Sequence, residues 1–139
     1  MAALKWPALR AAYDAFVKKA SDARRNEFDA FRAARAPLLS RFACFEVLRH
    51  RFTGPWWEWP AEWQQPDDAK CAEMRKGPDK HKVEFVEFVQ WTADSQLRAA
   101  KELSAELGMR VGLYLDVAVG VQSDGFDAWN EQTSISRHL

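Results

Sequence analysis

The segment GMRVGLYLDVAVGVQSDGFDAW, residues 108–129, decides how the rest of the chain is interpreted. It opens with Gly108, a typical stop for a preceding helix. Residues 111–121 then form a short apolar run rich in β-branched and aromatic side chains, which is typical of a buried β-strand. A helix that passes through one glycine into such a strand is the repeating join of an α/β sheet or barrel. We therefore expect one clear β-strand near residues 110–121.

The chain before this segment is predicted to be mainly α-helical, with five to six helices. Apolar residues at i, i+3 and i+4 spacing indicate an amphipathic helix over residues 8–20. Ser21 or Asp22 can cap the next helix, and Pro37 starts a third. The longest helix is expected over residues 79–107, where a wide apolar stripe predicts packing against a large surface.

The composition of the chain limits the classes of function that it can have. The 139 residues are the length of one domain, and the 20 basic and 20 acidic side chains cancel, so no basic excess favours nucleic acid. No apolar run approaches the roughly 20 residues that span a bilayer. Cys44 and Cys71 are isolated, lack metal-ligand spacing to histidine, and together with the absence of a secretory segment favour a reducing cytoplasm. We predict no metal and no cofactor.

The chain contains seven tryptophans, several of them in the segment PWWEWPAEW, residues 55–63. Flat indole faces could stack on the apolar faces of sugar rings, or the same side chains could fill the core around an irregular turn. The core role is the favoured interpretation, and the sugar-binding role stays open as the alternative.

Three segments resemble the 4-α-glucanotransferases (amylomaltases). GMRVGLYLDVAVGV with the following DAWNEQ is similar to a glycine-bounded strand and acidic loop of that family, PWWEWPAEW is similar to its W-x-x-W-P segment, and FVEFVQWTADSQLRAA resembles one of its helices. The three matches follow the family's order and cover about residues 41–139. One departure is Leu115, where many members carry arginine.

The resemblance implies a (β/α)8 TIM barrel, of which this chain would supply a helical region, residues 1–107, and one early strand with its loop, residues 108–139. We expect residues 1–139 to be a single unit, cut from a larger catalytic domain. The implied reaction transfers α-1,4-glucan segments between maltooligosaccharides by retaining double displacement, without a cofactor.

The family's catalytic carboxylates are not found in this sequence. The resemblance implies a nucleophile in R-x-D-H, an acid/base in G-E-D-L-G and a further aspartate in T-H-D, and none of these strings occurs. We therefore assign no catalytic residue, and we expect the chain alone to be inactive. A piece of a barrel should also expose apolar surface and self-associate.

The candidate substrate-binding residues follow the expected strand. Asp116 could hydrogen-bond a sugar hydroxyl, or it could be a structural acid held by loop amides. Asp127 and Trp129 could contact a saccharide, or they could act as a helix N-cap and a packing anchor. The rival hypothesis for the whole chain is a stand-alone, non-enzymatic helical module that binds a protein or a glucan.

Overall fold

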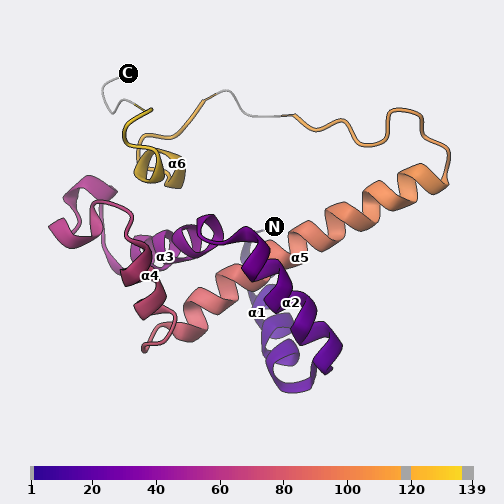
Figure 1. Ribbon diagram of the computed structural model, residues 1–139, viewed down its shortest axis with the longest axis horizontal. Coiled ribbons are helices and arrows are strands. Elements are labelled where there is room, and N and C mark those ends of the chain that lie inside the picture. Colours follow the sequence, from indigo (N-terminus) through magenta and orange to yellow (C-terminus); the bar gives the residue numbers. More distant parts are fainter. Residues whose placement is uncertain (1, 117–119, 136–139) are drawn as a thin grey trace.

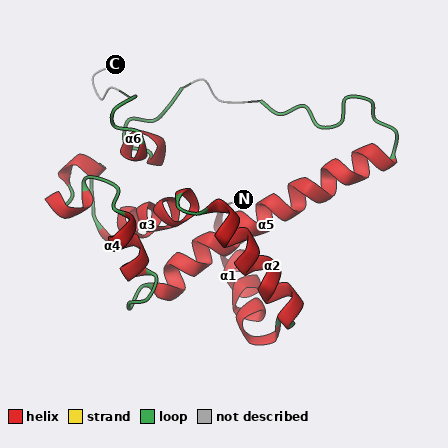
Figure 2. Ribbon diagram, in the orientation of Figure 1, coloured by secondary structure: helices red, strands yellow, loops and turns green. Residues whose placement is uncertain are grey.

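A computed structural model describes residues 2–116 and 120–135 of the chain. The described residues form an assembly of helices joined by loops (Figures 1 and 2). In chain order these are α1 (Ala2–Lys19), α2 (Asp22–Arg35), α3 (Leu38–Arg51), the 3-10 turns η1 (Trp56–Glu58) and η2 (Ala61–Trp63), α4 (Asp68–Met74), α5 (Lys80–Glu106) and α6 (Phe126–Asn130).

The expected β-strand near residues 110–121 is wrong: none of the described residues in this range is in a strand. Residues 117–119 lie outside the described part. A strand is stable only when its backbone groups pair with a neighbouring strand, and no described segment forms a strand that could pair with this one. The exposed fractions of Val111 (83%) and Tyr114 (91%) show that this apolar run is not buried. The fold of the described residues is therefore helical, and it does not support a partial TIM barrel.

Local signals in the sequence set several helix ends. The side chain of Ser21 accepts a hydrogen bond from the backbone N–H of Arg24, which caps α2. Asp67 caps α4 by accepting from the backbone N–H groups of Ala69 and Lys70. Gly108 follows α5 with φ of 74°, in the left-handed region that glycine adopts at a helix end.

Two hydrophobic cores hold the helices together, and α5 contributes to both. The first lies between α1, α2 and α5, and its buried members are Tyr13, Phe28, Phe85, Phe88 and Trp91. The second joins α3, the 3-10 turns, α4 and α6 to the start of α5, and its largest buried members are Phe45, Leu48, Trp56, Trp59, Val83 and Trp129. The C-terminal half of α5 projects beyond the other helices (Figure 1).

The tryptophan segment packs as core. Trp56 and Trp59 are buried, and each indole N–H donates to a backbone carbonyl, that of Ser123 at 2.9 Å and that of Gly54 at 3.2 Å respectively. Trp57 and Trp63 are half-buried at the edge of the same cluster. These indoles lock an irregular turn onto α3, which is the role that the sequence favoured.

Cys44 on α3 and Cys71 on α4 are both buried and form no disulfide. A hydrogen bond between the two thiols, together with burial, raises the pKa of Cys44. The same hydrogen bond lowers the pKa of Cys71. Both side chains pack in the second hydrophobic core. Within the described ranges, no helix is long and apolar enough to cross a membrane.

Candidate functional site

The three predicted substrate-binding residues lie in two different parts of the structure. Asp116 is exposed in the loop that follows α5, whereas Asp127 and Trp129 lie on α6. No hydrogen bond or ion pair of the described residues joins Asp116 to either of them. The structure thus brings Asp127 and Trp129 onto one short helix and does not add Asp116 to it.

Trp129 is fully buried, with 0% of its side chain exposed. Its indole N–H donates to the carbonyl oxygen of Trp63 at 2.9 Å, and its ring lies 5.4 Å from the ring of Phe45. These contacts give Trp129 the packing role that the sequence left as one of two alternatives. A sugar contact by this ring stays a prediction, and it would require the indole to become exposed.

Asp127 is the second residue of α6, and its side chain is exposed. The N-cap of this helix is Gly125, so the N-cap alternative for Asp127 is wrong. Among the described residues no partner binds the Asp127 carboxylate. It therefore remains available to an external group, next to Phe126.

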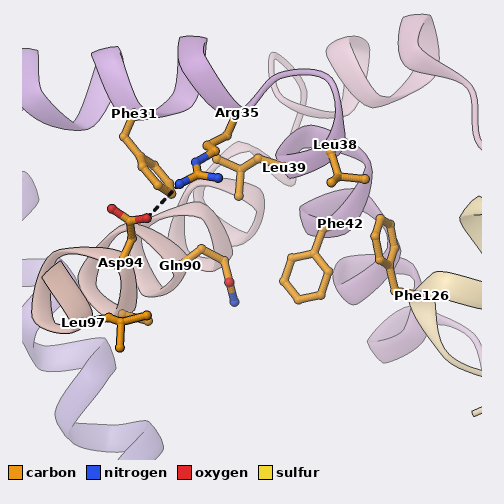
Figure 3. A pocket seen from close by; sticks show the side chains of 10 residues that line it. Phe31, Arg35, Leu38, Leu39, Phe42, Gln90, Asp94, Leu97 and Phe126 are labelled. Carbon is orange, nitrogen blue, oxygen red and sulfur yellow. Dashed lines mark hydrogen bonds and ion pairs between the residues drawn. The ribbon is translucent and has the colours of Figure 1, made fainter. Parts of the chain in front are cut away.

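Phe126 lines a cavity of about 420 Å³ between α2, α3, α5 and α6 (Figure 3). Its apolar walls are mainly phenylalanine and leucine side chains, and Phe42 and Phe126 meet edge-to-face with ring centroids 5.2 Å apart. The lining residues are Phe31, Arg35, Leu38, Leu39, Phe42, Gln90, Ala93, Asp94, Leu97 and Phe126.

Polar groups line one side of this cavity. Arg35 donates to Asp94 at 3.0 Å, and the second Asp94 oxygen accepts from Arg98 at 2.8 Å. Gln90 lies along the same side of α5, one turn before Asp94, and Figure 3 shows its amide beside the cavity. Apolar rings beside hydrogen-bonding groups are the arrangement that a small polar ligand with apolar faces requires.

A second hollow lies on the other side of the Arg35–Asp94 ion pair. Arg35, Asp94 and Leu97 also line this hollow, of about 500 Å³, together with residues of the loop after α5 that include Val111 and Leu113. The two hollows therefore adjoin at Arg35, Asp94 and Leu97. Sequence reasoning missed this site because its residues come from four separated helices and share no local spacing.

The site contains a single carboxylate, that of Asp94, and both of its oxygens are paired with arginine. Retaining glycosyl transfer needs two carboxyl groups roughly 5 Å apart. This cavity can therefore hold a ligand but cannot by itself carry out that double displacement.

A family model described as 4-alpha-glucanotransferase matches residues 1–138. The chain belongs to the 4-alpha-glucanotransferase family. The chain is 33% identical to a 4-alpha-glucanotransferase of Mycobacterium tuberculosis over 135 residues, which cover 95% of this chain and 18% of that protein. It is 34% identical to that of Thermus thermophilus over 128 residues, which cover 91% of this chain and 25% of that protein.

The chain thus spans about a fifth to a quarter of the length of these 4-alpha-glucanotransferases. No solved structure matches it. The family resemblance seen in the sequence is confirmed, although the barrel strand expected from it is not formed by the described residues.

Proposed function

We propose that this chain is part of a 4-alpha-glucanotransferase that moves α-1,4-glucan segments between maltooligosaccharides by retaining double displacement. The family match along residues 1–138 carries this proposal. The reaction needs a carboxylate nucleophile and a second carboxyl group as acid and base. The sequence contains none of the three strings in which the family resemblance places such carboxylates, so the chemistry would be supplied by other segments. A cytoplasmic setting belongs to the same proposal, since both thiols are free.

In this proposal the chain contributes structure and glucan contacts. Asp127, which follows Phe126 on α6, is the best-placed candidate, because its carboxylate is exposed and has no partner among the described residues. Asp116 is a second candidate in the exposed loop, and Trp129 would support the site from the core behind it.

We expect the chain alone to have no transferase activity, because it carries no pair of free carboxyl groups in a cavity described above. The measurement is incubation of the purified chain with maltotriose, followed by chromatography of the oligosaccharides. The full-length 4-alpha-glucanotransferase of Thermus thermophilus is the positive control. Formation of both longer and shorter maltooligosaccharides by this chain would contradict the prediction.

An exposed apolar band supports the proposal that residues 1–139 belong to a larger catalytic domain. The side chains of this band lie on the outer half of α5 and in the described parts of the loop after it: Leu97, Leu103, Leu107, Met109, Val111, Leu113, Tyr114, Leu115 and Val121. Among the described residues, only Leu4, Trp6 and Leu38 are other large hydrophobic side chains with comparable exposure. Exposed apolar surface of this extent is typical of an interface.

We expect the isolated chain to self-associate through this apolar band. Replacing either Val111 or Tyr114 with serine should by itself weaken the association roughly tenfold, because one buried side chain contributes on the order of 1–2 kcal/mol to an interface. Analytical ultracentrifugation over a range of concentrations measures the change. Leu4→Ser is the matched control, since Leu4 is 81% exposed and lies outside the band.

A stand-alone glucan-binding module is the second candidate function, and the Phe126 cavity is the observation that favours it. A monomeric chain with a cooperative thermal transition, together with saturable binding of maltoheptaose, would support this module. Strong self-association without such binding would favour the larger catalytic domain.

A further inference from the structure

A second cavity, of about 550 Å³, lies between α1, α3 and α5, and nothing so far assigns it a role. Its floor is apolar and consists of Phe42, Val47, Phe85, Val86 and Val89. It shares only Phe42 and Gln90 with the cavity of Figure 3. Its size is that of a small-molecule site.

Trp6 forms one edge of this cavity. Its indole is 56% exposed, and its ring centroid lies 6.3 Å from that of Phe85. An exposed tryptophan at the rim of an apolar pocket can cover the body of a bound ligand, because its flat face gains contact area as the ligand enters.

Arg10 supplies a positive charge beside this apolar floor. Its guanidinium carbon lies 3.6 Å from the centroid of the Phe85 ring, and within the described residues no carboxylate pairs with it. A guanidinium stacked on an aromatic face keeps its N–H groups free at the edge, and this edge fits the two oxygens of a carboxylate or phosphate.

The remaining charged groups of the cavity are mostly basic. Arg51 and Lys82 both pair with Asp79, which itself does not line the cavity. His50 also lines it, and Glu46 is the single carboxylate in the lining. The cavity therefore combines an apolar floor with a basic rim.

We propose that this cavity binds a small organic anion, a carboxylate or phosphate ester with an aromatic or acyl body. The anionic group lies at Arg10 and Lys82, and the apolar body rests on Val86 and Val89 beneath Trp6. A neutral sugar would gain nothing from the basic rim and would leave its hydroxyl groups against an apolar floor. The proposal does not depend on the transferase function.

The test uses naphthoate and naphthyl phosphate as anionic probes and naphthalenemethanol as the neutral control. Methyl NMR spectra of the whole chain locate the binding, with shifts expected at Val47, Val86 and Val89. We expect at least one anionic probe to bind roughly tenfold more tightly than the neutral alcohol, since it adds a charge-assisted hydrogen bond to the same body. The better anionic probe then shows whether the site prefers a carboxylate or a phosphate.

Variants distinguish this cavity from general apolar binding. Arg10→Gln should weaken binding of the anionic probe about tenfold and leave binding of the neutral probe unchanged. Trp6→Ala should weaken the binding of both probes. Lys18→Gln, an equal loss of charge at an exposed position of α1, should change neither. Circular dichroism confirms that each variant keeps its helices, as expected for changes at exposed side chains.

Three results would overturn the proposal. One is equal affinity for the anionic and neutral probes, and another is methyl shifts confined to the apolar band, at Leu103 and Leu113. The third is displacement of the anionic probe by maltotriose, which would make the cavity a sugar site.

Discussion

Replacing Trp129 with alanine is expected to lower the free energy of unfolding by about 3–5 kcal/mol, the range for removing a large buried aromatic side chain. Trp129 has no exposed area and packs against Phe45 and Phe126. The substitution leaves a cavity at the point where α6 meets α3, and it leaves the Trp63 carbonyl without its indole donor. Because α6 has only five residues, this one side chain carries much of its attachment.

Urea unfolding followed by circular dichroism measures this loss. Trp6→Ala is the matched control, because Trp6 is largely exposed, and its free energy of unfolding should change by less than about 1 kcal/mol. The loss in free energy of unfolding for Trp129→Phe should lie between those of the other two variants, since this replacement keeps an aromatic ring but removes the N–H donor. Equal stability of Trp129→Ala and the unchanged chain would show that α6 does not depend on this packing.

Replacing Glu87 with alanine is expected to cost roughly 3 kcal/mol of unfolding free energy, because it breaks a buried ion-pair network. Glu87 on α5 is 1% exposed, and its two oxygens lie 2.9 Å from Arg32 Nε and 3.2 Å from Arg75 Nε. These contacts link α5 to α2 and to the residue after α4. Without the carboxylate, the half-buried guanidinium of Arg75 would lose its ion-pair partner, and Arg32 would keep only its contact with Asp29.

Denaturant titrations of Glu87→Ala and Glu27→Gln give the comparison. Glu27 pairs with Arg24 at 2.6 Å, but both side chains are more than half exposed, so its replacement should change stability by less than about 0.5 kcal/mol. Similar effects for the two variants would contradict a structural role for the buried network.

The pH dependence of stability gives a second readout of Glu87. Burial raises the pKa of its carboxyl above the ordinary value of 4.5, and this effect outweighs the lowering by Arg32 and Arg75. A raised pKa means that the folded chain binds the proton more tightly. The contribution of this tighter proton binding to the free energy of unfolding is therefore fully present below pH 4.5. It is lost as pH rises through the higher pKa of Glu87 in the folded chain. The unchanged chain should gain stability relative to Glu87→Gln as pH falls from 7 toward 4.5.

Asp68 and Asp79 affect the pH dependence of stability in the opposite direction. A hydrogen bond from Arg41 lowers the pKa of Asp68, and one from Lys82 lowers that of Asp79, in both cases below 3.8. Their contributions are present above that value and are lost as pH falls through the lower folded pKa. The Glu87 effect is thus separable, because it acts in a higher pH range.

The sequence by itself determined the features that depend on neighbouring residues. The caps at Ser21 and Asp67 and the helix end at Gly108 follow from side chains and backbone angles within a few residues. The family was also readable from three short segments, since residue identity alone carries that information.

Tertiary structure decided the features that depend on residues far apart in the chain. The run at 111–121 has the composition of a strand, but strand formation needs a paired neighbour, and no described segment provides one. The packing of Trp129 against Phe45 and its hydrogen bond to the Trp63 carbonyl join residues that lie far apart in the sequence. Phe31, Asp94 and Phe126 share no spacing, and only the packing of α2, α5 and α6 brings them to one cavity. Local chemistry specifies helices and their ends, whereas burial, pairing and cavities arise from contacts that no short stretch of sequence contains.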